Sequence, residues 1–156
     1  MRIYCGKSSL YAQEEAPIPY SPLEIDNFYN VRGNNDFADI PKDLTLTIDG
    51  LNFFICHGHL FHIDESMYNL EQYALNHKID VVCFGHSHNP TCYKKENTLF
   101  INPGSVTFPR GNYPHPTYCI FDTENHEVQF YDLKENQPCN PFEAKKKESF
   151  FKRFFK

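Results

Sequence analysis

Two apolar segments of this chain each end in a His-x-His triplet, and no other feature constrains the fold as strongly. Residues 51–56 lead into His57-Gly58-His59, and residues 80–84 lead into Gly85-His86-Ser87-His88. The continuous apolar run 80–84 is typical of a fully buried strand. In α/β folds, ligands collect at loops that follow strand ends, because the scaffold fixes their positions. The two triplets therefore predict an α/β protein with a histidine-lined site at its strand ends.

The rest of the chain alternates strand and helix signals. The Asp49-Gly50 pair between two apolar runs indicates a hairpin, and apolar residues at three- and four-residue intervals over 66–78 indicate an amphipathic helix. A capping box that begins at Ser21 predicts a short helix. Residues 1–20 hold at most one strand, at 2–5. Further strands are expected at 91–95, 98–102, 117–121 and 126–132. We expect an α/β fold of two stacked mixed β-sheets flanked by helices.

The chain divides into three parts. Residues 1–20 form an atypical N-terminal segment, residues 21–142 form the main domain, and residues 143–156 form a basic aromatic tail. As a helix, the tail would show a stripe of four phenylalanines beside a basic flank. Such a helix either contacts a membrane surface or a partner, or packs on its own domain or on a sister subunit.

Length, charge and cysteines exclude several classes of protein. At 156 residues there is room for one domain, and no stretch approaches the ~20 apolar residues of a membrane span. The tail holds six basic and two acidic residues, a net charge of +4. Because the whole chain has a net charge of −5, the other 142 residues carry −9. An acidic body argues against a nucleic-acid-binding surface. Six cysteines without a C-x-x-C pair are typical of buried thiols in a reducing compartment, and no signal-peptide pattern opens the chain. We therefore expect a cytoplasmic protein.

His86 and His88 stand two residues apart, so in an extended segment both rings project to the same side. Imidazole is the commonest side-chain ligand of transition metals, and glycines beside the triplets permit a tight backbone. For His59 and His62, a place around the site and a packing role are both open. The string 57–64 partly matches the His-x-His-x-Asp-His of metallo-β-lactamase folds, but its aspartate follows the third histidine, so we set that family aside. The isolated histidines are expected to be solvated or satisfied by their neighbours: His77, His115 and His126.

Four motifs follow one another along the chain: Val31-Arg32-Gly33-Asn34-Asn35-Asp36, His57-Gly58-His59, Gly85-His86-Ser87-His88 and Asn102-Pro103-Gly104-Ser105. In this order they resemble the motifs of calcineurin-like metallophosphoesterases, in particular the small bacterial and archaeal phosphodiesterase branch of the YfcE type. The resemblance implies an α/β sandwich that hydrolyses phosphate esters of small molecules, with diesters favoured. It also implies up to two divalent ions that clamp the phosphate and deliver a bound hydroxide.

Carried over position by position, the resemblance assigns metal ligands. Asn34, His57 and His86 would bind one metal, and His88 would bind the other. Mixed nitrogen and oxygen ligands suit a divalent transition metal. Mn is expected first, with Ni, Fe, Co or Zn as alternatives.

The resemblance also assigns catalytic and supporting positions. Asn35 stands where relatives often carry a His or Cys that donates a proton to the leaving group. Because an amide cannot give up a proton at neutral pH, that role is vacant or filled elsewhere, with His59 as the candidate. Arg32 and Asp36 are expected to support the site, and the turn at 102–105 to brace it.

Two motifs of the family are missing. The chain contains no Asp-x-His segment and no Gly-Asp dipeptide, so the carboxylate that bridges the ions and most ligands of the second ion are unaccounted for. With residues 1–3 on the family's first strand, Ser8 and Leu10 stand where Asp and His should be. We therefore expect an N-terminally incomplete fold with an open sheet edge, which invites pairing with another copy of the chain.

Three explanations of these departures are open. In the first, the N-terminal part of a working phosphodiesterase is absent or replaced. In the second, the chain is a catalytically inactive family member that serves as a binding or scaffold module. In the third, other acids supply the missing ligands, such as Glu14, Glu15 or Asp26. Even losses around the ligands of a metal cost 10–100-fold in affinity or activity, so the sequence favours one ion over a complete pair.

Overall fold

The computed structural model describes residues 1–6, 9–13, 28–37 and 39–143. The N-terminal elements are β1 (Arg2–Gly6), β2 (Ser9–Gln13) and β3 (Phe28–Asn30). The middle of the chain forms β4 (Asp43–Ile48), β5 (Leu51–Cys56), the 3₁₀-helix η2 (His59–Phe61), α1 (Tyr68–Asn76) and β6 (Val81–Cys83). The last strands are β7 (Thr91–Lys95), β8 (Thr98–Asn102), β9 (Thr117–Asp122), β10 (Glu127–Asp132) and β11 (Gln137–Cys139).

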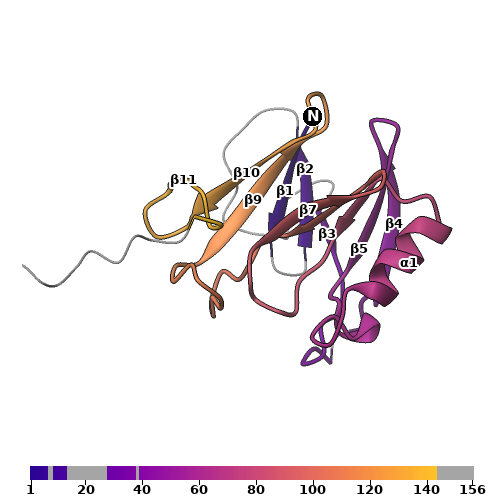
Figure 1. The fold of residues 1–156 in the computed structure, drawn as a ribbon, viewed down its shortest axis with the longest axis horizontal. Helices are drawn as coiled ribbons and strands as arrows, with labels where there is room; N and C mark the ends of the chain where they lie inside the picture. Colours follow the sequence, from indigo (N-terminus) through magenta and orange to yellow (C-terminus); the bar gives the residue numbers. More distant parts are fainter. Residues whose placement is uncertain (7–8, 14–27, 38, 144–156) are drawn as a thin grey trace, which may run out of the picture.

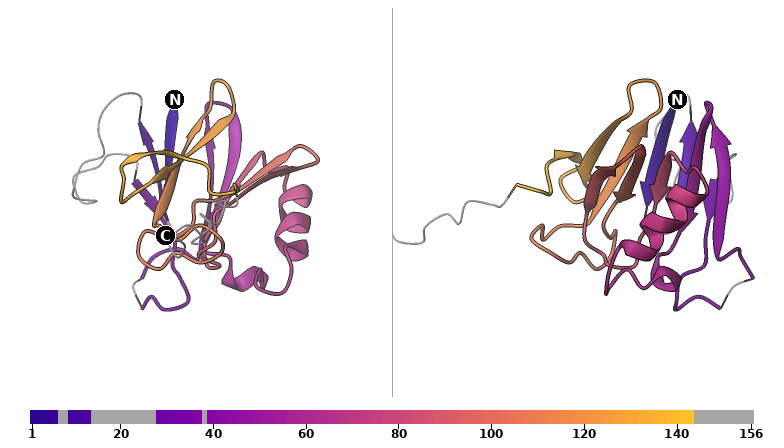
Figure 2. Two further views of the ribbon diagram at one scale, coloured as in Figure 1. Left: turned by 60° about the vertical axis from the view of Figure 1, so that its left-hand side comes forward. Right: turned by 45° about the vertical axis from the view of Figure 1, so that its right-hand side comes forward.

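Two β-sheets stack on each other (Figures 1 and 2), which confirms the predicted architecture. The five-stranded sheet has the order β4-β5-β6-β8-β7 and is mixed, because β6 runs parallel to both β5 and β8. The six-stranded sheet has the order β11-β10-β9-β1-β2-β3 and is antiparallel throughout, not mixed as predicted. Helix α1 covers the outer face of the five-stranded sheet.

Strand β5 shows why its sequence is apolar on both sides. Phe53 and Ile55 point into the core between the two sheets, where Phe53 meets Phe121 edge to face at 5.8 Å. Phe54 and Cys56 point to the other side, into the core beneath α1. A strand buried on both faces reads as a continuous apolar run. Burial of Cys56, and equally of Cys83 and Cys119, agrees with the expectation of buried thiols.

The N-terminal region contains more strands than its sequence indicated. The predicted strand at 2–5 is β1, which pairs with β2 on one side and with β9 on the other. Strands β2, β3 and β11 were not predicted, because they span only three to five residues. The helix expected from Ser21 and the helical tail lie outside the described residues.

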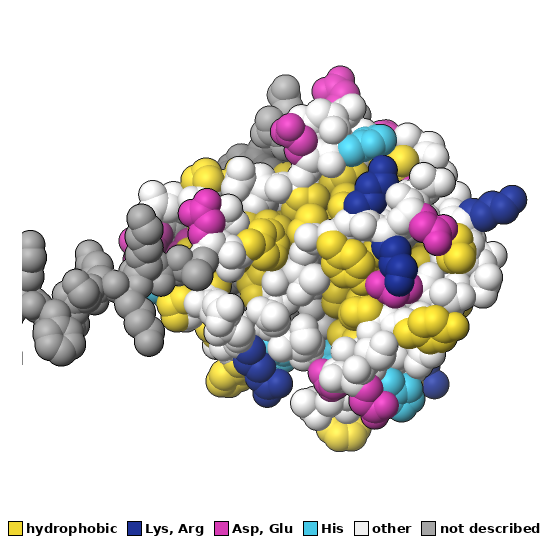
Figure 3. Space-filling model, viewed as in Figure 1, with side chains coloured by type: hydrophobic (Ala, Val, Ile, Leu, Met, Phe, Trp, Pro, Cys, Tyr) yellow, Lys and Arg dark blue, Asp and Glu magenta, His cyan; other side chains and the backbone are white. Residues whose placement is uncertain are grey.

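On the face shown in Figure 3, hydrophobic side chains gather near the middle of the molecule with charged side chains around them. A cavity of about 260 Å³ opens beside the start of the central strands, with Leu51, Val81, Leu99 and Phe121 among its lining residues. In the parts of the chain that the structure describes, no helix is long and apolar enough to cross a membrane.

Candidate functional site

The site begins where two parallel neighbours of the five-stranded sheet end. Strand β5 ends at Cys56 and β6 at Cys83, and since they run in the same direction, the loops that follow them start side by side. The amide of Gly85 donates a 3.1 Å hydrogen bond to the carbonyl of His57 and joins the two loops. This pairing brings the His57 and His86 rings together.

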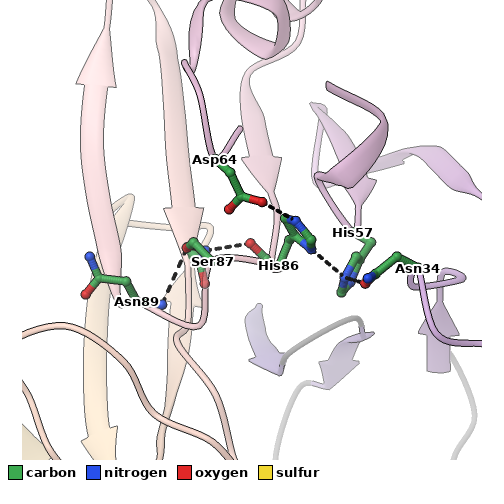
Figure 4. A network of polar contacts seen from close by, with 8 residues as sticks. Asn34, His57, Asp64, His86, Ser87 and Asn89 are labelled. Atoms are coloured by element: carbon green, nitrogen blue, oxygen red, sulfur yellow. Dashed lines mark hydrogen bonds and ion pairs between the residues drawn. The ribbon is translucent and has the colours of Figure 1, made fainter. Parts of the chain in front are cut away.

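Three side chains from distant segments meet at this point (Figure 4). Nε2 of His57 lies 3.0 Å from Oδ1 of Asn34 and 3.3 Å from Nδ1 of His86. His57 is 4% exposed, whereas Asn34 lies in an exposed turn after β3. The structure therefore brings together the three residues that the motifs suggested for one metal.

The spacing of these donor atoms suits a single cation. Donors bound at about 2.0–2.2 Å from one ion, with angles of about 90–110° between them, lie about 2.8–3.6 Å apart, and both separations at Nε2 of His57 fall in that range. Without a metal, Nε2 of His57 donates its proton to Oδ1 of Asn34 and to Nδ1 of His86. A bound cation would replace this proton. Within the described ranges, no three His, Cys, Asp or Glu side chains are placed to hold a metal ion. The cluster thus fits one cation, held by two imidazoles and one amide.

A carboxylate that the sequence did not single out extends this cluster. Nε2 of His86 donates a 2.6 Å hydrogen bond to Oδ2 of Asp64 (Figure 4). Asp64 lies after η2, in a turn closed by the amides of the next two residues, which donate to the carbonyl of His62. The one sequence signal was an acidic residue shortly after the first histidine triplet.

His88 makes its hydrogen bond away from this cluster. Both His86 and His88 adopt a left-handed backbone, with φ of 63° and 60°, so the extended segment predicted for them is wrong. Nδ1 of His88 donates a 2.8 Å hydrogen bond to the carbonyl of Phe108, which leaves Nε2 of a neutral ring as its lone-pair nitrogen. Asn35 is exposed in the turn that carries Asn34.

His59 lies beside the cluster. Its ring centroid is 5.2 Å from that of His57 and 6.1 Å from that of His86. Nδ1 of His59 is buried and has no hydrogen-bond partner among the residues described. Burial, and then the nearby side chains of His86, Arg32 and Lys42, lower the pKa of His59 below its ordinary value of 6.5. The ring is therefore neutral at pH 7, with a nitrogen that a ligand could satisfy.

Two turns hold these side chains in place. The fully buried Asn102 donates from Nδ2 to the carbonyl of Gly85 at 2.9 Å and to Oγ of Ser87 at 3.0 Å, so its turn braces the second histidine loop, as predicted. On the other side, Oδ2 of Asp36 accepts a 2.7 Å hydrogen bond from the amide of Gly33. A Cβ at Gly33 would lie 3.0 Å from Oδ2 of Asp36 and 3.2 Å from Cε1 of His57, so a larger residue would crowd both side chains.

The three isolated histidines, His77, His115 and His126, are satisfied by neighbours, as predicted. His77 donates from Nδ1 to the carbonyl of Tyr73 at 2.8 Å, and His126 stacks on Phe121. His115 binds a buried carboxylate. The alternative acidic ligands considered above lie outside the described residues: Glu14, Glu15 and Asp26.

Sequence comparison places this architecture and site in a known family. The profile of the calcineurin-like phosphoesterase superfamily domain matches residues 13–126, so the chain belongs to that superfamily. It is similar to the "probable metallophosphoesterase YsnB" of Bacillus subtilis, with 36% identity over 140 residues that cover 88% of this chain and 78% of YsnB. It is also similar to the phosphodiesterase YfcE of Escherichia coli, with 38% identity over 126 residues that cover 69% of this chain and 64% of YfcE.

Solved structures agree with this membership. A "predicted phosphoesterase" from Streptococcus pneumoniae has a TM-score of 0.66 at 28% identity, and the match covers 70% of this chain and 64% of that one. Zinc-bound Vps29 from Entamoeba histolytica has a TM-score of 0.58 at 20% identity, over 70% of this chain and 64% of that one, which shows a shared fold alone. The chain spans less than two thirds of YfcE and of the S. pneumoniae protein. The named relatives are metallophosphoesterases and phosphodiesterases, so by resemblance the chain is a metal-dependent hydrolase.

Proposed function

We propose that this chain hydrolyses phosphate esters of small molecules, diesters in preference, with an incomplete dinuclear metal site. Asn34, His57 and His86 would hold one divalent cation, and His88 would contribute to a second position through Nε2. The convergence of donor atoms from the first three residues carries the proposal. When bound, a divalent cation supplies Lewis-acid chemistry and an acidified water for attack on phosphorus.

The chain's own residues bind and orient the substrate in this proposal. The exposed amide of Asn35 can donate a hydrogen bond to a phosphate oxygen. His59, whose buried Nδ1 has no partner among the described residues, can hydrogen-bond the ester and exchange a proton with its leaving oxygen. We therefore place Asn35 and His59 on the substrate side of the cluster.

The missing carboxylates limit how tightly a cation is held. The chain has no Asp-x-His and no Gly-Asp motif, and the three converging donors are neutral when His57 and His86 are unprotonated. Neutral donors leave the charge of the ion uncompensated. We therefore expect binding at one position to exceed binding at the second, and activity to require added metal, with Mn²⁺ expected to be the most effective.

The test is metal content of the purified full chain together with hydrolysis of bis-p-nitrophenyl phosphate in added Mn²⁺, with p-nitrophenyl phosphate as the monoester comparison. His57→Ala and His86→Ala should each lower turnover by at least about 100-fold, because each removes a direct ligand. His126→Ala is the matched control, since its imidazole stacks on Phe121 away from the cluster. Turnover that survives both ligand substitutions, or a wild-type chain without metal and without turnover, contradicts the proposal.

A second candidate function is a catalytically inactive binding or scaffold module. It is favoured by the absence, within the described ranges, of any three His, Cys, Asp or Glu side chains placed to hold a metal ion. The same assay separates the two candidates, because a module of this kind would show no turnover with any of Mn²⁺, Ni²⁺, Fe²⁺, Co²⁺ or Zn²⁺.

The proposal extends to the setting of the protein. We place it in the cytoplasm, with residues 21–142 as the phosphoesterase domain and 143–156 as a basic aromatic tail that packs on its own domain or on a sister subunit, in preference to contacting a membrane or another partner. Self-association through an edge strand is also proposed, because β3, β4, β7 and β11 end their sheets within the described part of the chain. Sedimentation at several concentrations would show a monomer mass throughout if this last idea is wrong.

A further inference from the structure

The contact between Asp64 and His86 determines which nitrogen of His86 carries a proton. Oδ2 of Asp64 lies 2.6 Å from Nε2 of His86. An ionised carboxylate only accepts hydrogen bonds, so Nε2 must carry the hydrogen. In a neutral imidazole the other nitrogen then has the lone pair. That nitrogen, Nδ1, is the one that lies 3.3 Å from Nε2 of His57.

We propose that Asp64 is a positioning residue that holds His86 in the Nε2–H tautomer and so presents the Nδ1 lone pair to a divalent cation. This inference rests on the proposed function, since the cation is the one that Asn34 and His57 would share with His86. Metal-binding histidines usually donate their second N–H to a carboxylate or carbonyl, which orients the ring and makes the ligand more basic. Asp64 also brings a negative charge close to a cluster of neutral donors.

The fold holds Asp64 in place independently of His86. The preceding residue, Ile63, is 8% exposed and packs in the core beneath α1. The amides of Glu65 and Ser66 donate to the carbonyl of His62 and close the turn around Asp64. The carboxylate is therefore presented by a packed loop, although its side chain is 63% exposed.

An ordinary surface ion pair would have a different signature. Exposed ion pairs contribute about 0–1 kcal/mol to stability and leave other sites untouched. A positioning role instead changes the tautomer of His86 and the affinity for metal, with little change in unfolding. The two roles are separable, because the protonated nitrogen of a histidine can be read directly by NMR.

The experiment measures Mn²⁺ and Zn²⁺ affinity of the full chain by competition with a chelator, and the His86 tautomer by ¹⁵N NMR of the metal-free protein. Asp64→Ala should weaken binding about 10–100-fold and convert His86 to a mixture of tautomers. Asp64→Asn should have a smaller effect, because its amide oxygen still accepts a hydrogen bond from Nε2. Glu65→Ala is the matched control, since it removes an exposed charge one residue away.

The outcomes separate this inference from the proposed function. A wild-type chain that binds metal, with Asp64→Ala and Glu65→Ala binding equally well, overturns the role of Asp64 and leaves the proposed function standing. An Nδ1–H tautomer of His86 in the wild-type protein overturns it as well. A wild-type chain that binds neither Mn²⁺ nor Zn²⁺ refutes the proposed site, and with it the metal role of Asp64.

Discussion

Asp132, at the end of β10, supplies a quantitative test of the structure away from the metal cluster. Its carboxylate is 2% exposed and accepts from the Tyr113 hydroxyl at 2.7 Å, from His115, and from the amides of Lys134 and Glu135. Burial by itself would raise the pKa of Asp132, but these donors together outweigh burial and lower the pKa from 3.8 to about 2.

The sign follows from the direction of the shift. Because the pKa is lower in the folded protein, the ionised carboxylate stabilises the fold above about pH 4, and this contribution is lost as the pH falls towards 2. A shift of this size corresponds to about 2–3 kcal/mol. About half of the contribution should be gone at pH 3.

The assay is urea unfolding of the wild type and Asp132→Asn at pH 7, 5, 4 and 3. At pH 7 the variant should be less stable by about 1–3 kcal/mol, because charged acceptors are replaced in a buried network. The gap should narrow as the pH falls, since the variant has no carboxylate to protonate. Asp39→Asn, at an exposed position, is the control and should show no such trend. A gap that stays constant from pH 7 to pH 3 would refute the account of Asp132.

Two further predictions use matched pairs of residues and urea unfolding. Leu70→Ala should lower the free energy of unfolding by about 2–5 kcal/mol, because Leu70 is fully buried on the inner face of α1. Leu75→Ala, on the exposed side of the same helix, should lower it by less than about 0.5 kcal/mol. Similar losses for the two variants would mean that α1 does not pack as described. Gly58→Ala and Gly50→Ala both place a side chain at positive φ, 106° and 79°, but only at Gly58 would the new Cβ lie 2.7 Å from Cδ1 of Ile63. Gly58→Ala should therefore be the more costly by at least about 1 kcal/mol, and equal losses would contradict the close approach.

The strands that sequence reasoning located correctly have a clear local pattern. The hairpin β4–β5 turns at Asp49 and Gly50, and its inner strand is apolar from Phe53 to Cys56 because both of its faces are buried there. Strands β9 and β10 pair across a short turn, and the residues of β9 alternate between buried and partly buried. Where strands are only three to five residues long, as β2 and β3 are, local pattern carries too little information. The position of β3 also depends on its pairing with β2, which is distant in the sequence.

The site shows the same division between motif and geometry. Motif order selected Asn34, His57 and His86, and the structure brings them together. The order of the motifs did not point to Asp64, because the turn that directs this carboxylate toward His86 has no distinctive spacing in the sequence. The prediction that His86 and His88 project to the same side of an extended segment is also wrong, because both residues adopt a left-handed backbone.

The position of the cluster also links the site to the stacking of the two sheets. His57 and His86 follow adjacent strands of the five-stranded sheet, whereas Asn34 follows β3, the edge of the six-stranded sheet. Val31, which begins that connecting segment, is 1% exposed in the core between the sheets. The 3.0 Å separation between Asn34 and His57 is therefore set by how the sheets pack, and not by one loop alone. A cation held by all three residues would bind only the correctly stacked form and would stabilise it by mass action, so binding at this cluster reports on the integrity of the whole sandwich.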